Sequence, residues 1–426
     1  MSRIAVIGTG YVGLTTGACF AHLGHQVICA DLIPEKIERL SRGDVPILEA
    51  GLDDLVREGL DTKRLSFVLG EEPAVRDCEF AYLCVPTPQG ADGSADLSYI
   101  RVAAEAIGPV LPSESIVVNK STVPVGSTRV VELALHRDDV RVVSNPEFLR
   151  EGSAVHDFLN PDRIVIGAED QAAAGRVAAL FSALKAPVIV TDPASAETIK
   201  YASNAFLATK VSFVNAIANV CEVVGADVRE VVLGMGYDKR IGFEFFKPGP
   251  GWGGSCFPKD SRALVHIAEE AGYDFGLLRG VIDVNDAQFE RVADKVERIV
   301  GGSLQGCRVA VWGLTFKART DDLRDSPSLA VIERLLARGA SVRAYDPAVK
   351  SLPQGGPDGV EVCADPYAAC EGAAALVVLT EWDDFRWLDF DKVAAALSAP
   401  RVVDGRNLLD PAKLRRRGFE YLGVGR

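Results

Sequence analysis

Histidine is scarce in this sequence, and cysteine forms no metal-binding pattern. The five histidines stand apart, and none of the nine cysteines belongs to a C-x-x-C pair. Structural zinc needs clustered Cys and His ligands, and disulfide frameworks are typical of short secreted chains. The sequence therefore predicts no metal site, no disulfides and no obvious histidine base.

Net positive charge and long apolar runs are also missing. The net charge is −13, no apolar run of membrane-spanning length is evident, and the N-terminal MSRIAVIG leads straight into a strand pattern. A negative field repels nucleic acids and anionic membranes. We expect a cytoplasmic protein without nucleic-acid or membrane partners, in which local cations and backbone amides hold any anionic ligand.

The apolar segments that are present predict an α/β fold. Strand candidates alternate with amphipathic helical stretches, which is typical of a doubly wound parallel sheet; they cover residues 4–7, 27–30, 80–85, 116–119, 140–143, 164–166 and 188–190. One long helix without Gly or Pro follows over 196–224, then further helix over 260–271 and 277–300. We predict three domains: a Rossmann-type domain (1–195), a central helical domain (196–300) and a Rossmann-like α/β domain (301–426).

The last of these domains repeats the strand order of the first. The C-terminal domain has four strand segments in succession, VAVWGL, VRAYDP, ALVVLT and RVVDGR. They correspond in order to four segments of the N-terminal domain, IAVIGTG, VICADL, AYLCVP and IVVNKS. The C-terminal copy lacks the glycine fingerprint. A second nucleotide-binding topology and ordinary α/β similarity both account for this pattern.

A glycine-rich segment, Gly8-Thr9-Gly10-Tyr11-Val12-Gly13, follows the first strand and begins a helix. In such a fingerprint the first glycine permits a tight turn, the second lets a pyrophosphate approach, and the third lets the helix pack on the strand. Asp31 ends the second strand, where a carboxylate binds a ribose diol and repels a 2′-phosphate. The sequence predicts NAD rather than NADP, with Lys36 either at the adenosine ribose or solvated.

A second glycine-rich segment, GPGWGGSCFPKD (249–260), carries a lone cysteine. Its glycines allow the backbone to approach a ligand. Pro258 suits the first turn of a helix, so Cys256 stands just before a helix N-terminus, where the dipole and Lys259 lower the pKa of the thiol. A thiolate that adds to an aldehyde forms a thiohemiacetal and then a thioester, so Cys256 indicates oxidation of an alcohol through to an acid. The alternative is a buried structural cysteine.

Lys200 and Asn204 share one face of the predicted long helix, since they are four residues apart. A cation and an amide there would stabilise the oxyanions of hydride transfer and thioester hydrolysis. A surface lysine is the commoner outcome for such a residue.

Together these segments resemble the UDP-glucose/GDP-mannose dehydrogenase family. The resemblance spans nearly the whole chain and is carried by GTGYVG (8–13), CVPTP (84–88), STVPVGS (121–127), NPEFLREG (145–152), KYASNAFLA (200–208), GPGWGGSCFPKD (249–260), GLTFKARTDDLRDSP (313–327), YDP (345–347) and DGRN (404–407). One departure is Asn215-Ala216, where many members have Asn-Glu.

The resemblance implies roles for particular residues within these motifs. Cys256 is the covalent nucleophile, Glu147 a general acid/base, and Lys200, Asn204 and Asp260, the last with Thr122, stabilise oxyanions and manage water. The implied cofactor contacts are Tyr11, Val12, Asp31, Lys36, Thr87, Thr122, Glu151 and Arg324, beside Gly8, Gly10 and Gly13 of the fingerprint. The implied substrate contacts are Glu147, Phe148, Leu149, Arg150, Glu151, Lys200, Asn204, Arg240, Phe245, Gly249, Gly253, Lys317 and Arg406. In the family the residue matching Arg240 often reaches a neighbouring subunit, which implies a homodimer built on the central helix.

The expected activity is NAD-dependent four-electron oxidation of the C6 alcohol of a nucleotide sugar, with UDP-glucose to UDP-glucuronate as the favoured case. The same chemistry on dTDP-glucose, GDP-mannose or a UDP-N-acetylhexosamine is one alternative. A two-electron hydroxyacid dehydrogenase, which would not need Cys256 or the C-terminal domain, is another. A catalytically silent nucleotide-sugar sensor is a third, against which the intact Cys256, Lys200 and Asp260 argue.

Overall fold

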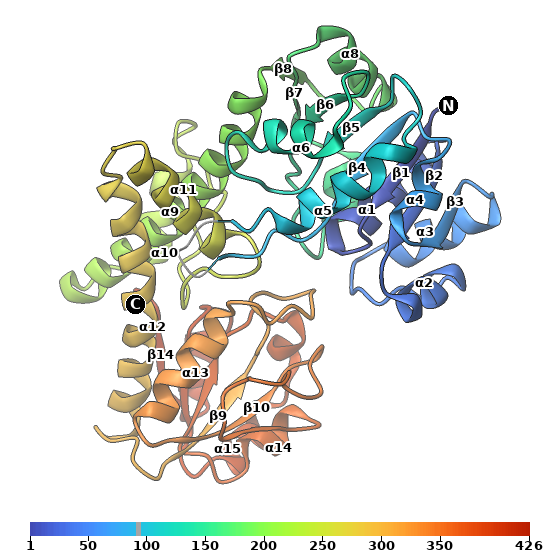
Figure 1. Cartoon of the computed structure of the whole chain (residues 1–426). Coiled ribbons are helices and arrows are strands. Elements are labelled where there is room, and N and C mark those ends of the chain that lie inside the picture. Colours follow the sequence, from blue (N-terminus) through green and yellow to red (C-terminus); the bar gives the residue numbers. More distant parts are fainter. Residues whose placement is uncertain (91–94) are drawn as a thin grey trace. The chain divides into compact units, whose positions relative to one another are not determined.

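A computed structural model of the chain describes residues 1–90 and 95–426 (Figure 1). The chain divides into two compact units. The first unit comprises Met1–Ser203 and Arg262–Ala271, and the second comprises Asn204–Ser261 and Gly272–Arg426. Over the described residues, each unit contains one sheet of named strands.

The first unit is built on an eight-stranded sheet of order β3-β2-β1-β4-β5-β6-β7-β8. Its strands are β1 (Arg3–Ile7), β2 (Gln26–Asp31), β3 (Leu65–Leu69), β4 (Phe80–Leu83), β5 (Ile116–Asn119), β6 (Arg141–Ser144), β7 (Ile164–Gly167) and β8 (Val188–Thr191). All neighbours pair in parallel except β6 and β7, which meet antiparallel through Ser144 and Gly167. The predicted doubly wound parallel sheet is thus confirmed, with this one pair as its antiparallel exception.

Helices cover both faces of this sheet. They are α1 (Tyr11–His22), α2 (Pro34–Ser41), α3 (Leu52–Asp61), α4 (Glu71–Val75), α5 (Ser98–Ile107), η1 (Gly108–Val110), α6 (Ser127–Leu135), α7 (Ala154–Leu159) and α8 (Gln171–Leu180). Alternate residues of β1 enter different cores: Ile4 and Val6 pack with α1, whereas Ala5 and Ile7 pack with α5. Burial on both faces explains why the strands read as continuous apolar runs.

The longest helix, α9 (Pro193–Val224), passes from the first unit into the second. Pro193 stands at its first position, where proline is tolerated, and the absence of Gly and Pro after it allows the helix to reach 32 residues. By length and composition it is the one helix in the described parts of the chain that is long and apolar enough to cross a membrane. The expectation from sequence that no apolar run reaches membrane-spanning length therefore does not hold for α9 by this criterion. The core helix of a globular protein meets the same criterion of length and composition.

The second unit is built on a six-stranded parallel sheet of order β11-β10-β9-β12-β13-β14. Its strands are β9 (Arg308–Trp312), β10 (Ser341–Tyr345), β11 (Val360–Val362), β12 (Ala375–Val378), β13 (Arg401–Asp404) and β14 (Glu420–Gly423). The remaining helices in the described residues are α10 (Val228–Gly236), α11 (Phe257–Glu270), α12 (Gly276–Val300), α13 (Pro327–Ala337), α14 (Pro366–Cys370), η2 (Asp383–Trp387), α15 (Phe390–Ala396) and α16 (Pro411–Arg416). Val309 and Val311 pack with α12 and α13, whereas Ala310 and Trp312 pack with α15.

The α/β fold class and the repeated topology are confirmed. The first six strands of one sheet and the six strands of the other share the order 3-2-1-4-5-6 typical of dinucleotide-binding folds. Three strands were not predicted, namely β3, β11 and β14. Each is a partly exposed strand of three to five residues at a sheet edge, so its apolar signal is weak.

Candidate active site

The Gly8–Gly13 loop has the backbone geometry of a pyrophosphate cradle. Gly8 has φ +95°, and a Cβ there would lie 2.7 Å from the Cys84 carbonyl oxygen; a Cβ on Gly13 would lie 1.9 Å from the Gly8 carbonyl oxygen. A Cβ on Gly10 would meet nothing within 4 Å, and no side chain caps α1 at this residue. The first-turn amides and the dipole of α1 are therefore suited to a phosphate, so this loop fits the pyrophosphate of NAD.

Asp31 closes the same site at the end of β2. Its Oδ2 accepts hydrogen bonds from the Thr9 amide (3.0 Å), the Thr9 hydroxyl (2.6 Å) and Lys36 (2.9 Å). Partial burial opposes ionisation, but these hydrogen bonds outweigh it and lower the pKa of Asp31 to about 2. Asp31 is a carboxylate at neutral pH, as acceptance of ribose hydroxyls requires. Lys36 lies against this carboxylate rather than fully in solvent.

Glu49, which was not predicted from the sequence, links this glycine loop to the loop that carries Glu151. The Glu49 side chain is 5% exposed and accepts hydrogen bonds from the amides of Gly152 (2.6 Å) and Ala154 (2.9 Å) and from the Tyr11 hydroxyl. Burial, and then the Glu49 carboxylate, raise the pKa of Tyr11, so its phenol stays protonated and donates. No local motif marks Glu49, because its partners are distant in sequence.

A buried ion pair joins Lys200 of α9 to Glu147. Nζ and Oε1 are 2.7 Å apart, and both side chains are 4% exposed. Burial opposes ionisation of Glu147, but the Lys200 ammonium outweighs it and lowers the pKa of this carboxyl. Glu147 therefore rests as a carboxylate, which is the state of a general base. Lys200 is not the surface lysine that its sequence context also allowed.

A second buried lysine, Lys120, lies in the same loop cluster and was not predicted. Its Nζ donates to Asn145 Oδ1 at 3.2 Å, and Asn145 in turn donates to the Val165 carbonyl at 2.8 Å. Burial lowers the pKa of Lys120 to about 8, against the attraction of Glu147. Lys120 and Asn145 thus hold the start of the NPEFLREG segment.

Thr87 and Thr122, which follow β4 and β5, also meet in the first unit. The Thr87 hydroxyl donates to the Thr122 carbonyl at 2.9 Å. Carboxyl ends of neighbouring parallel strands share one edge of a sheet, which explains why residues 35 apart in sequence come together. The pairing places two predicted cofactor contacts side by side.

In the second unit, Cys256 stands directly before α11, as predicted. It is partly exposed, with its Sγ 3.6 Å from the Ser255 hydroxyl, and its carbonyl accepts the Asp260 amide at 2.9 Å. The Asp260 side chain is 1% exposed, accepts a hydrogen bond from Asn204 Nδ2 at 2.6 Å and pairs with Lys259. A thiol, a carboxylate, an amide and an ammonium therefore surround the first turn of one helix.

The glycines before Cys256 pack against the protein itself. A Cβ on Gly253 would lie 1.9 Å from the Asp325 carbonyl oxygen. Gly254 has φ +83°, and a Cβ there would lie 2.8 Å from the Phe316 ring. Gly251 has φ +134°, and a Cβ there would lie 2.5 Å from the Phe289 ring. From the sequence, these glycines were expected to allow the approach of a ligand. The structure gives another reason, which is close contact with residues 316–325 and with α12.

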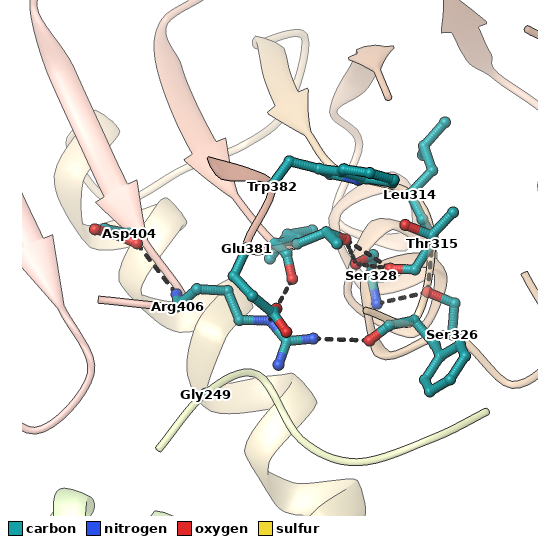
Figure 2. Close-up of polar contacts among 12 residues, drawn as sticks. Gly249, Leu314, Thr315, Ser326, Ser328, Glu381, Trp382, Asp404 and Arg406 are labelled. Atoms are coloured by element: carbon teal, nitrogen blue, oxygen red, sulfur yellow. Dashed lines mark hydrogen bonds and ion pairs between the residues drawn. The ribbon is translucent and has the colours of Figure 1, made fainter. Parts of the chain in front are cut away.

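Arg406 lies beside Gly249, at the carboxyl edge of the second sheet (Figure 2). Its Nε donates to the Leu379 carbonyl (2.7 Å) and pairs with Glu381 (3.0 Å), and its Nη2 donates to the Phe316 carbonyl (3.0 Å). A Cβ on Gly249 would lie 3.3 Å from Nη1. The guanidinium is thus fixed in orientation, as planar recognition of a ligand requires.

The predicted site residues are divided between the two units. The first unit holds Gly8, Gly10, Tyr11, Val12, Gly13, Asp31, Lys36, Thr87, Thr122, Glu147, Phe148, Leu149, Arg150, Glu151 and Lys200. The second holds Asn204, Arg240, Phe245, Gly249, Gly253, Cys256, Asp260, Lys317, Arg324 and Arg406. Arg240 and Arg324 are exposed and pair with Asp238 and Asp322, two residues away in each case. Within residues 1–90 and 95–426 no group of three or more Cys, His, Asp or Glu residues has the arrangement of a metal site.

The fold and the first-unit site define a class of protein, the nucleotide-dependent dehydrogenases. A 3-2-1-4-5-6 sheet, a glycine cradle at a helix N-terminus and an ionised Asp31 at the end of β2 are the features of an NAD site. Comparison with known proteins then identifies the family. Residues 2–185, 194–287 and 310–411 match, respectively, the NAD binding, central and UDP binding domains of the UDP-glucose/GDP-mannose dehydrogenase family, and the chain belongs to that family.

Relatives resemble the chain over its whole length. The UDP-glucose 6-dehydrogenase of Pseudomonas aeruginosa is 47% identical, over 100% of this chain and 97% of that protein. A UDP-glucose dehydrogenase structure from Pyrobaculum islandicum has a TM-score of 0.93 at 39% identity, with 100% and 98% covered. A UDP-D-ManNAc dehydrogenase structure from Pyrococcus horikoshii has a TM-score of 0.89 at 27% identity, with 100% and 99% covered. The chain is accordingly an NAD-dependent oxidoreductase that acts on a CH–OH group of a nucleotide sugar.

Proposed function

We propose that this protein oxidises the C6 alcohol of UDP-glucose to the carboxylate of UDP-glucuronate, through a covalent intermediate on Cys256. The relatives named above as UDP-glucose dehydrogenases support the substrate. The observation that carries the chemistry is the placement of a partly exposed Cys256 at the start of α11, next to the buried Asp260–Asn204 pair. A dehydrogenase that stopped at the aldehyde would not need such a thiol.

Separate side chains serve the first oxidation and the capture of the aldehyde. NAD, when bound at the Gly8–Gly13 loop, accepts the hydride of each oxidation. Glu147 takes the proton of the alcohol, and Lys200 stabilises the alkoxide. The Cys256 thiolate then adds to the aldehyde carbon and its oxygen takes up a proton, which gives a thiohemiacetal.

The second oxidation and the hydrolysis complete the sequence. Loss of a hydride and a proton converts the thiohemiacetal into a thioester. Water cleaves the thioester to the carboxylate and releases the Cys256 thiol. In this step Asp260, with Thr122, manages the water, while Asn204 and Lys200 stabilise the oxyanion.

Replacement of Cys256 tests this mechanism. Wild-type protein should form two NADH per UDP-glucose, whereas Cys256→Ala should still bind NAD and UDP-glucose but lose turnover to the acid by a factor of about 10³ or more. Cys256→Ser should turn over very slowly and accumulate a protein–sugar adduct visible by intact mass spectrometry. Cys307→Ala, at another partly exposed cysteine, is the matched control and should be fully active. Two NADH per sugar at an ordinary rate from Cys256→Ala would refute the covalent mechanism.

The identity of the sugar is a separate question, because a structurally similar relative is a UDP-D-ManNAc dehydrogenase. We expect UDP-glucose to give the highest kcat/KM in a panel that also contains dTDP-glucose, GDP-mannose and UDP-N-acetylhexosamines. A higher kcat/KM for another member would keep the chemistry and change the substrate.

We also infer a homodimer formed through α9. The described helix leaves apolar side chains exposed at seven-residue intervals, with Phe206 64%, Phe213 47% and Val220 54% exposed. An apolar stripe of that spacing is typical of a helix with a partner. The Arg240 side chain is 88% exposed, as expected if it reaches a neighbouring subunit. A monomeric mass in solution would contradict the dimer.

A cytoplasmic location completes the proposal. No cysteine in the described parts of the chain forms a disulfide, which suits a reducing compartment. Cell fractionation tests this location.

A further inference from the structure

Amide side chains, rather than a neighbouring strand, hold the backbone of the glycine loop ahead of Cys256. Asn285 of α12 pairs with Trp252 in both directions: the Trp252 amide donates to Oδ1 at 2.8 Å, and Nδ2 donates to the Trp252 carbonyl at 3.0 Å. Asn285 is 4% exposed. The side chain thus makes the two bonds that a β-strand partner would make.

Gly249 is held in the same way by two side chains. Its amide donates to Asn215 Oδ1 on α9 at 2.8 Å, and its carbonyl accepts Gln288 Nε2 on α12 at 2.9 Å. Asn219 Nδ2 donates to Gln288 Oε1 at 3.0 Å and so fixes the orientation of that amide. Asn215 and Gln288 are 0% and 1% exposed.

The indole of Trp252 adds a further anchor. Its Nε1 donates to the Ser212 hydroxyl at 2.8 Å, and that hydroxyl donates to the Val281 carbonyl at 2.8 Å. Both anchored residues of the loop are therefore bonded to α9 and α12.

A glycine-rich loop needs such anchors if it is to place a reactive atom. Glycine loses more backbone entropy on ordering than any other residue, and a nucleophile must be held within about 0.5 Å of its productive position. Cys256 follows Trp252 by four residues, with Gly253 and Gly254 between them. An anchor at Trp252 therefore restricts the positions that the Cys256 thiol reaches.

We propose that Asn285, together with Asn215, Gln288 and Asn219, forms a set of positioning residues that holds the Cys256 thiol at the start of α11. The proposal rests on the proposed role of Cys256 as the nucleophile. The amides act through the backbone of the loop, so they are expected to affect kcat and thiol reactivity rather than NAD binding.

The test compares Asn285→Ala with Asn407→Ala. Asn407 is a matched control because it makes the same two-way pair elsewhere in the second unit: its Nδ2 donates to the Val424 carbonyl at 2.8 Å, and the Val424 amide donates to its Oδ1 at 3.0 Å. Both variants should lower the unfolding midpoint. Asn285→Ala alone should lower kcat at least about tenfold, with NAD affinity unchanged.

Thiol chemistry provides a readout that does not depend on turnover. Alkylation of Cys256 by iodoacetamide, followed by peptide mass spectrometry with Cys307 of the same chain as reference, gives its rate against pH. In Asn285→Ala the midpoint of this profile should move toward that of an ordinary thiol, about 8.5, because the thiolate is no longer held at the helix N-terminus. Asn407→Ala should leave the midpoint unchanged.

A milder variant covers the case in which Asn285→Ala does not fold. Asn219→Ala removes only the support of Gln288, and it should lower kcat about threefold and move the alkylation profile in the same direction. If neither variant moves the profile more than Asn407→Ala does, the positioning role is wrong, even where Cys256→Ala has abolished turnover. If Cys256→Ala keeps its turnover, the proposed mechanism fails instead, and the alkylation profile still decides the role of the amides.

Discussion

The two sheets have the same turn after their first strand (β1 and β9) and the same carboxylate at the end of their second (β2 and β10). The sites formed at these strand ends nevertheless differ. In the first unit the Thr9 amide and hydroxyl donate to Asp31, and in the second the amides of Leu314 and Thr315 donate to Asp346. Gly8 and Gly313, which directly follow β1 and β9, have φ of +95° and +97°. One turn and one carboxylate thus recur at corresponding positions.

The segments after this turn differ between the two sheets. In the first unit α1 begins at Tyr11, and a Cβ on Gly10 would meet only open space. In the second unit residues 313–326 separate β9 from α13. Asp346 is 3% exposed there and accepts a hydrogen bond from the indole Nε1 of Trp382 at 3.1 Å. Asp346 cannot accept ribose hydroxyls, because protein donors already cover its carboxylate. The shared strand order therefore does not determine which ligand each sheet binds. The segment after the first strand determines it.

The largest expected effect comes from breaking the shared turn. Gly8→Ala and Gly313→Ala each place a Cβ at positive φ, 2.7 Å from the Cys84 carbonyl oxygen and 2.4 Å from Thr380 respectively. Strain and overlap should lower the free energy of unfolding by about 3–5 kcal/mol in both variants. Urea denaturation measures this loss.

Gly10→Ala is the control for the turn variants. It has room for a Cβ and an ordinary φ of −68°, so it should lose less than about 1 kcal/mol of stability. It should nonetheless weaken NAD binding about tenfold, because the added methyl occupies the approach of the pyrophosphate. Normal NAD affinity in Gly10→Ala would show that the pyrophosphate does not approach there.

An intermediate effect is expected from removing the two carboxylates. Asp346→Ala leaves buried donors without an acceptor and should cost about 3 kcal/mol of unfolding free energy, with NAD affinity unchanged. Asp31→Ala should lower the free energy of unfolding by only about 1 kcal/mol. The wild type should prefer NAD over NADP by at least about tenfold in kcat/KM, and Asp31→Ala should abolish this preference. Comparable use of both cofactors by the wild type would contradict the role of Asp31.

The smallest effect concerns two buried ionisable groups at the ends of corresponding strands, β5 of the first sheet and β13 of the second. One group is a lysine and the other is an aspartate. Lys120 follows β5 and Asp404 ends β13. Burial lowers the pKa of Lys120 to about 8, so between pH 8 and its unfolded value of about 10.4 the unfolded chain binds more protons. Stability should therefore rise with pH, by about 1.5 kcal/mol from pH 8 to 9.5, and Lys120→Met should lack this rise.

Asp404 gives the opposite dependence. Burial raises its pKa, so above the unfolded value of about 3.9 the folded chain binds more protons, and stability falls as pH rises through the folded pKa. Asp404→Asn should remove this fall. Urea midpoints measured against pH check both signs, and parallel profiles for wild type and variant would refute either assignment.

Much of the fold was readable in the sequence because its signals are local. Buried strands such as β5 (Ile116–Asn119) begin with continuous apolar residues, and α9 lacks Gly and Pro after Pro193, so the buried strands and the long helix follow from composition alone. The Gly8–Gly13 fingerprint and the start of α11 after Cys256 were also readable, because their backbone requirements restrict the residue types.

Tertiary structure alone decided the partners of the polar side chains. Sequence spacing placed Lys200 and Asn204 on one helix face, but the structure pairs one with Glu147 and the other with Asp260. Glu49, Lys120 and Asn285 carry no local signal, since each acts on residues at least 25 positions away. Local propensity fixes elements, whereas burial and hydrogen bonding depend on which elements the fold brings together. For that reason the sequence determined the family and the fold and predicted Cys256 as the nucleophile, and the tertiary structure decided which partners the buried charges and amides have.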